Sequence, residues 1–115
     1  MVSVKVIKLD SINNARRIVL KVGSSLIVNP ETGNINESWL ESLIQDILFL
    51  INKNKEILIV SSGAIALGKS ELNFQNKSLK LSEKQAAAAT GQILLAKAWK
   101  SIFEKINIKC GQILV

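Results

Sequence analysis

Two short apolar runs, separated by an amphipathic stretch, dominate the first half of this chain. Residues 17–22 and 56–60 are mostly aliphatic and have the length of buried strands. Between them, apolar side chains recur at three- and four-residue steps over residues 37–51, which predicts a helix that begins after Asn36 with Glu37 in its first turn. A strand, a helix and a second strand in this order predict parallel strands joined by a right-handed crossover.

The rest of the chain continues the alternation of helices and strands. We expect a loop over 23–35, a helix over 63–72, a polar loop over 73–81, a helix from Ser82 to about 105 and a third strand over 108–115. Ser82 and Gln85 have the spacing of a capping box, in which each side chain binds a free backbone N–H at the start of a helix. Residues 1–15 are mixed in character and are interpreted as a short strand or a loose arm ahead of a domain over 16–115.

Composition fits one folded domain of this kind. The 115 residues are 48% hydrophobic, which is enough to bury a core. Most apolar residues are aliphatic and few are aromatic, as expected when helices cover both faces of a parallel sheet. We therefore expect a three-layer α/β/α sandwich with a mainly parallel sheet. Four aromatic side chains and the single cysteine are expected to be buried: Trp39, Phe49, Trp99, Phe103 and Cys110.

The charge balance narrows the class of partner. Lys and Arg number 15 against 9 Asp and Glu, which gives a net charge of +6. The cations are spread along the chain without a run of five or an interleaved aromatic series, so we expect anionic small molecules as ligands rather than nucleic acid. No apolar stretch approaches the roughly 20 residues of a membrane span. A single cysteine is compatible with a reducing compartment, and we expect a cytoplasmic location.

The sequence contains no histidine, so the candidate chemistry rests on lysine, hydroxyl and backbone N–H groups. Both strands end at small, glycine-bearing turns, and open α/β sheets bind ligands at the carboxyl ends of their strands. Lys21 precedes the last residue of the first strand, and Gly23, Ser24 and Ser25 follow that strand. This group is either a phosphate site with Lys21 as its cation or a plain turn beside an exposed lysine.

The second strand leads into Ser62, Gly63 and Ala64, which open a predicted helix. Glycine here either serves only the backbone conformation of a tight turn or lets the helix N-terminus approach an anionic substrate. Ser62 has no histidine to activate it, so we interpret it as a hydrogen-bond donor rather than a nucleophile. The small residues of segment 85–92 predict close packing of the last helix.

Four segments together resemble the glutamate 5-kinases of the amino acid kinase superfamily. They are LKVGSSL at 20–26, VSSGAIALG at 60–68, QAAAATGQ at 85–92 and GQILV at 111–115. The resemblance extends over residues 17–115, and the second and third segments are the more specific to these enzymes. The kinase half of the bifunctional pyrroline-5-carboxylate synthases is similar in the same segments.

The resemblance implies an amino acid kinase fold and an enzyme that uses ATP, with Mg2+ on the phosphates. Such an enzyme phosphorylates the γ-carboxylate of L-glutamate in the first step of proline synthesis. By the same resemblance, Lys21 is the catalytic cation and binds the ATP phosphates together with Gly23 to Ser25. Ser62 to Ala64 would hold glutamate, and the complete enzyme would be a homo-oligomer.

The chain departs from these enzymes in two ways. Family members continue with further strands that carry more substrate- and nucleotide-binding residues, so this chain resembles the N-terminal portion of a kinase domain, as if truncated. It is expected to be inactive by itself. Asn54 stands where the family usually has glycine. Three alternatives stay open: an amino acid kinase for acetylglutamate, carbamate, aspartate or UMP; a non-catalytic remnant or interaction module of the same fold; and a basic nucleic-acid-binding module.

Overall fold

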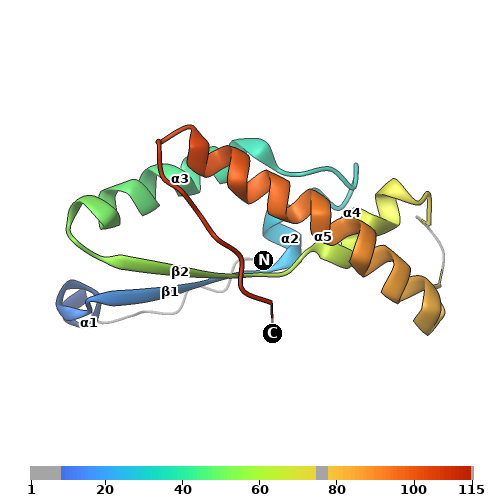
Figure 1. Cartoon of the computed structure of the whole chain (residues 1–115), viewed down its shortest axis with the longest axis horizontal. Coiled ribbons are helices and arrows are strands. Elements are labelled where there is room, and N and C mark those ends of the chain that lie inside the picture. The colour runs from blue at the N-terminus through green and yellow to red at the C-terminus, as the bar shows by residue number, and fades with distance from the viewer. Residues whose placement is uncertain (1–8, 75–77, 115) are drawn as a thin grey trace.

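The computed structural model describes residues 9–74 and 78–114. Its helices and strands, in chain order, are α1 (Leu9–Asn14), β1 (Arg17–Val22), α2 (Ser24–Ile27), α3 (Glu37–Asn52), β2 (Glu56–Ser61), α4 (Ala64–Glu71) and α5 (Leu81–Glu104). Helices α3 and α5 lie on one side of the paired strands, and α4 continues from the end of β2 (Figure 1). The α/β class expected from the alternating pattern is confirmed.

Strands β1 and β2 pair in parallel, as predicted. The register runs from Arg17 opposite Glu56 to Val22 opposite Ser61, so both strands end at the same level. At the other end of the pair, Nη2 of Arg17 lies 2.8 Å from Oε2 of Glu56. Helix α3 provides the predicted crossover between the two strands and packs against β2 and α5.

The two faces of this sheet differ. Successive side chains of a strand point to opposite faces, and in β1 the side chain of Val22 is buried while that of Lys21 is exposed. On the face away from the helices, Val19, Leu58 and Val60 are 56%, 45% and 49% exposed. The described helices therefore cover one face of the two strands, and the opposite face is open to solvent.

The hydrophobic core lies between the strands and the helices. In α3, Leu40, Ile44 and Ile47 are buried at steps of four and three, so one stripe of this helix faces inward. Ile27 of the short helix α2 is also fully buried. Three of the predicted core aromatics lie in this core or pack against it, and these are Trp39, Trp99 and Phe103.

Three predicted segments differ from the structure. Residues 9–14 form helix α1 where the sequence predicts a strand or a loose arm, and residues 1–8 lie outside the described residues. The predicted loop over 23–35 contains the short helix α2. The third strand predicted over 108–115 is not formed by residues 108–114, and residue 115 lies outside the described residues. An apolar run becomes a strand only when a neighbouring strand pairs with its backbone, and the described sheet holds β1 and β2 alone.

Two predictions of burial are wrong. Phe49 is 60% exposed because it follows the buried Ile47 by two positions, which places it on the opposite side of α3. Lys53 Nζ lies 5.0 Å from the centre of the Phe49 ring, so the exposed ring makes a cation–π contact at the surface. Cys110 is exposed because the segment that contains it forms no strand in the described residues.

The limits of two helices depend on local hydrogen bonding and backbone conformation. Helix α5 begins before Ser82, and the Glu83 carboxylate accepts a hydrogen bond of 3.1 Å from the backbone N–H of Lys80. The capping pair predicted from Ser82 and Gln85 is therefore wrong.

After α3, Asn54 adopts the left-handed conformation with φ 61°, which asparagine tolerates better than most residues. This explains why asparagine can stand where the resembling family has glycine.

Candidate functional site

The carboxyl ends of the two strands lie side by side and share a backbone hydrogen bond. The Ser62 N–H donates to the Val22 carbonyl at 3.0 Å. After β1, the Gly23 carbonyl accepts from the Leu26 N–H at 3.1 Å and starts helix α2. After β2, the chain turns at Gly63 into helix α4. The two glycine-bearing turns identified in the sequence are therefore neighbours in space.

A hollow of about 530 Å³ opens at these strand ends. Four of the predicted site residues line it: Ser24 comes from the first strand end, and Ser62, Gly63 and Ala64 come from the second. Helix α5 contributes Gln92 to the lining of the same hollow. Small-molecule sites commonly measure roughly 300–1,000 Å³, so this space suits a small ligand.

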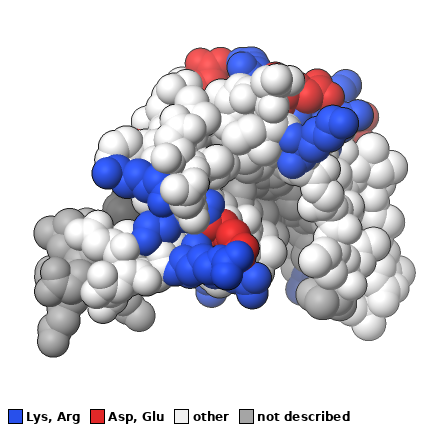
Figure 2. Space-filling view, turned by 60° about the vertical axis from the view of Figure 1, so that its left-hand side comes forward, with Lys and Arg blue, Asp and Glu red and all other residues white. Residues whose placement is uncertain are grey.

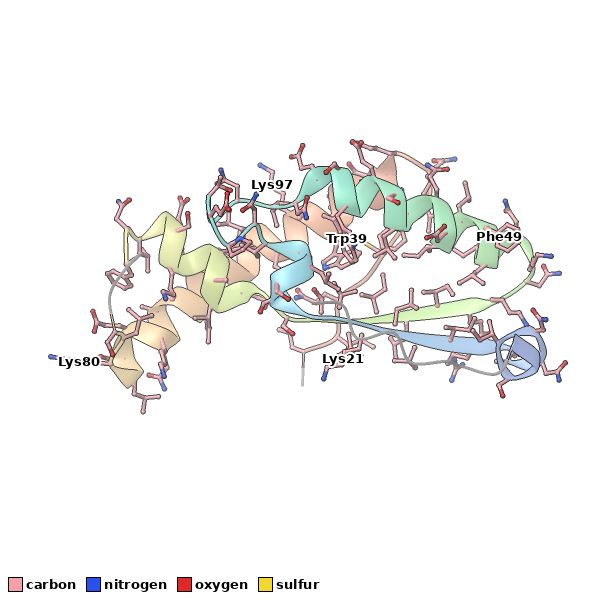
Figure 3. All side chains as sticks on the ribbon, turned by 180° about the vertical axis from the view of Figure 1, so that it is seen from behind. Lys21, Trp39, Phe49, Lys80 and Lys97 are labelled. Carbon is pink, nitrogen blue, oxygen red and sulfur yellow. The ribbon has the colours of Figure 1, made fainter. Side chains whose placement is uncertain are left out.

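The other three predicted residues do not line this hollow. Lys21 points away from the helices, on the open face of the sheet (Figure 3). Within residues 9–74 and 78–114, Lys21 forms no ion pair. Gly23 and Ser25 also lie outside the lining of the hollow. The strand ends thus separate two places, the hollow on the helix side and the exposed surface around Lys21.

The two glycines at the strand ends have different structural needs. Gly23 has φ −75°, and a Cβ added there would meet nothing within 4 Å. Gly63 has φ 121°, and its added Cβ would lie 2.8 Å from Cγ2 of Ile27. The backbone turn therefore requires glycine at position 63, in line with the interpretation that Gly63 serves the backbone conformation. The backbone at position 23 does not require glycine, and Gly23 leaves open space beside the backbone where an anion could approach.

Helices α4 and α5 are in backbone contact, which explains the small residues of segment 85–92. A Cβ added at Gly68 would lie 1.7 Å from the carbonyl oxygen of Ala87. A Cβ added at Gly91 would lie 1.6 Å from the carbonyl oxygen of Ala64. The close packing predicted for this segment is confirmed, and it fixes the α5 wall of the hollow against α4.

Motif-based interpretation of the sequence missed three polar residues of the hollow, Ser61, Lys69 and Gln92. The two helical residues lie three or four positions from other lining residues, namely Ile65 and Ala66 for Lys69 and Ala88 for Gln92. Helical spacing would have found these two. Lys69 is half-buried, and no acidic side chain of the described residues lines the hollow. The hollow therefore favours an anionic ligand.

A second hollow of about 380 Å³ lies between α3, α4 and α5. Lys97 and Glu71 are among the residues that line it, and none of the predicted site residues does. This second hollow therefore has no link to the strand-end residues, and the candidate site stays with the hollow beside Ser62.

Among the described residues, no group of three or more His, Cys, Asp or Glu side chains could hold a metal ion. A helix with the length and apolar character of a membrane span is also absent from the part of the chain that the structure describes. On the face shown in Figure 2, Lys and Arg side chains lie in several separate places with acidic side chains beside some of them.

Comparison with known proteins adds a family and a set of relatives. The sequence pattern of the amino acid kinase family matches residues 16–115. A glutamate 5-kinase of Bradyrhizobium sp. (strain BTAi1) is 52% identical over 104 residues, which cover 90% of this chain and 28% of that protein. Glutamate 5-kinases of Brucella ovis and Brucella abortus are each 53% identical over 107 residues, which cover 93% of this chain and 28% of theirs. The chain thus spans less than a third of the length of these curated relatives.

Proposed function

Because this chain belongs to the amino acid kinase family, we propose that it forms the N-terminal portion of a glutamate 5-kinase domain. The reaction would be the ATP-dependent phosphorylation of the γ-carboxylate of L-glutamate to glutamyl 5-phosphate, the first step of proline synthesis. One observation carries this proposal. Ser24 from one strand end and Ser62 from the other line a single hollow that holds a lysine and, among the described residues, no acid.

The hollow on the helix side is the glutamate site in this proposal. Ser62 to Ala64 would hold the reacting end of the substrate through the Ser62 hydroxyl and the N–H groups that open α4. Side chains of an α-helix lean toward its N-terminus, which directs Lys69 back toward Ala64. Lys69 is therefore the group that we assign to the second carboxylate of glutamate, at the far end of the hollow.

The exposed surface around Lys21 is the phosphate site in this proposal. Lys21 has no ion-pair partner in the described part of the chain, so its charge is available to a ligand. Gly23 leaves open space next to the backbone, and the exposed hydroxyls of Ser24 and Ser25 add donors. ATP would thus approach the strand ends from the open face while glutamate occupies the hollow.

The reaction requires positioning and charge stabilisation rather than acid–base catalysis. An oxygen of the γ-carboxylate attacks the γ-phosphorus of ATP, the bond to the bridging oxygen breaks, and ADP leaves with that electron pair. The carboxylate is already ionised at neutral pH, so no base is needed in a chain without histidine. Lys21 neutralises charge on the transferring phosphoryl group. A Mg2+ ion bound together with ATP would supply further neutralisation of the phosphate charge, and the described residues include no cluster of three or more Asp, Glu or Cys side chains that would hold it.

A cytoplasmic location and assembly into homo-oligomers belong to the same proposal. Both rest on the likeness to glutamate 5-kinases.

A hybrid enzyme tests the proposed function. Residues 16–115 would replace the aligned segment of the Brucella ovis relative, and acyl phosphate formed from ATP and L-glutamate would be trapped with hydroxylamine. We expect the hybrid to form the trapped product, whereas the 115-residue chain by itself is expected to form none. A soluble hybrid that is inactive with glutamate, or that prefers aspartate, acetylglutamate, carbamate or UMP, would contradict the proposal.

A further inference from the structure

A chain of hydrogen bonds links helix α5 to the end of β2. The indole Nε1–H of Trp99 donates to Ser61 Oγ at 3.0 Å, and the Ser61 hydroxyl donates to the Ser62 carbonyl at 3.1 Å. Trp99 packs against the hydrophobic core, with its ring centre 6.2 Å from that of Phe103. Packing therefore holds the indole in place, and its N–H is a fixed donor to the strand end.

These bonds hold the backbone of Ser62 from both sides. Its N–H donates to the Val22 carbonyl at 3.0 Å, and its carbonyl accepts from Ser61. The next residue, Gly63, has φ 121°, so the peptide between the two residues stands at a turn that few backbones adopt. Ser62 lines the hollow, and its hydroxyl makes no hydrogen bond within the described part of the chain. Both backbone groups are engaged, and the hydroxyl is left for a ligand.

We propose that Trp99 is a positioning residue for the substrate hollow. Through Ser61, its indole N–H fixes the Ser62–Gly63 peptide and thereby aims the Ser62 hydroxyl and the first N–H groups of α4 at the ligand. This inference rests on the proposed function, because the ligand it names is L-glutamate. An aromatic side chain that only filled the core would need no donor, and Phe103 fills such a place one turn further along α5.

NMR spectroscopy of the 115-residue chain tests this role, because the chain has two tryptophans and each gives one indole N–H signal. Trp39→Phe assigns the signals and serves as the matched control, since Trp39 packs against the core and does not line the hollow. On titration with L-glutamate, we expect the Trp99 indole signal to shift and the Trp39 signal to stay. Without ligand, Ser61→Ala should speed the exchange of the Trp99 indole proton with solvent.

The same titrations measure affinity in the variants. Trp99→Phe and Ser61→Ala should each raise the Kd for L-glutamate about three- to tenfold, the fold-change expected for one net hydrogen bond. Ser61→Thr keeps the hydroxyl and should bind as the unaltered chain does. Trp39→Phe should also bind normally, which separates positioning from a general loss of core packing.

Each outcome decides between the two claims. If glutamate binds the unaltered chain and the Trp99→Phe and Ser61→Ala variants equally well, the inference on Trp99 is wrong and the proposed function stands. If the unaltered chain binds no glutamate, the inference on Trp99 fails, and the hybrid enzyme decides separately on the proposed function. If Trp99→Phe does not fold, the Ser61 variants decide, since both keep the indole in place. A loss with alanine that threonine repairs supports the inference, and equal affinities overturn it.

Discussion

Replacing Lys21 should impair catalysis and leave the stability of the fold nearly unchanged. It is exposed and forms no ion pair in the described part of the chain, so Lys21→Ala should change the free energy of unfolding by less than about 0.5 kcal/mol. Loss of the proposed contact with the phosphoryl group should lower kcat of the hybrid enzyme roughly 100- to 1,000-fold. The hydroxylamine assay and urea unfolding measure the two effects. Lys97→Ala removes an exposed lysine of the second hollow and is the matched control (Figure 3). Equal turnover in both variants would contradict the role of Lys21.

Lys69 should act on glutamate affinity rather than on the phosphoryl transfer. It lines the hollow beside Ser62, and a charged hydrogen bond to the second carboxylate would be lost in Lys69→Met. We expect the KM for glutamate of the hybrid to rise roughly ten- to a hundredfold, with a smaller change in the KM for ATP. Steady-state kinetics with each substrate varied in turn provide the check, with Lys97→Met as control. A rise confined to the KM for ATP would argue against this placement.

The two glycines at the strand ends should respond differently to alanine. Gly63→Ala combines a positive φ with a Cβ 2.8 Å from Ile27, and should reduce the free energy of unfolding by about 1–3 kcal/mol. Gly23→Ala meets open space at an ordinary φ, and should change it by less than about 0.5 kcal/mol. Urea unfolding of both variants is the measurement. Similar losses for the two would show that the turn at Gly63 is not under the strain inferred.

At the scale of elements, the contact between α4 and α5 depends on two glycines. A Cβ at Gly68 or Gly91 would lie within 1.7 Å of a backbone carbonyl oxygen of the facing helix, and backbone atoms cannot move aside as a side chain can. Gly91→Ala should force the helices apart and cost about 2–4 kcal/mol of stability. Thermal unfolding compares it with Gly111→Ala, whose added Cβ meets nothing within 4 Å. A melting temperature unchanged in Gly91→Ala would refute the close contact.

An ion pair ties the segment after α5 to α3 and should be lost in alkali. Nζ of Lys105 lies 2.7 Å from Oε1 of Glu41, and this hydrogen bond and the Glu41 charge raise the pKa of Lys105 above its ordinary value. A raised pKa means that the stabilising contribution is complete below the unfolded pKa of about 10.4 and disappears as the pH rises through the folded value. Both groups are exposed, so the contribution is small.

Glu41→Gln tests this pH dependence. The variant should be slightly less stable than the unaltered chain near pH 8, and the difference should shrink as the pH rises through the raised pKa of Lys105, because Lys105 then loses its charge in both chains. Urea midpoints of the two chains from pH 8 into alkali give the comparison. A difference that widens in alkali would have the wrong sign for this pair.

At the scale of the whole molecule, the sequence predicts those elements whose pattern is local. The structure has the strands over 17–22 and 56–60 and the helix over 37–51 within a residue of their expected limits. Each of them is predicted from the hydrophobic pattern of its own residues. The third strand expected over 108–115 does not form in the described residues, because a strand depends on more than its own residues. Its apolar residues give it the propensity of a strand, but pairing depends on a neighbouring strand, which the run itself does not encode.

The candidate site could be predicted in part, for a similar reason. Ser24 and Ser62 to Ala64 were accessible to sequence reasoning because parallel strands bring their carboxyl ends together. That Lys21 stands on the opposite side from the hollow also follows from the alternation along β1, but the sequence does not say which face the helices cover. The bond from Trp99 to Ser61 joins residues 38 positions apart and depends on how α5 packs, which no local motif records.

The matched ends of β1 and β2 make this site intolerant of one-residue insertions and deletions. Both strands have six residues and stop opposite each other, with Val22 beside Ser61. One extra residue inside β1 would reverse the faces of part of the strand and turn Lys21 toward the core, since side-chain direction repeats every two residues. One extra residue inside β2 would turn Ser61 away from Trp99 in the same way. Among related chains, changes of length are therefore expected in the 29–35 turn rather than within either strand.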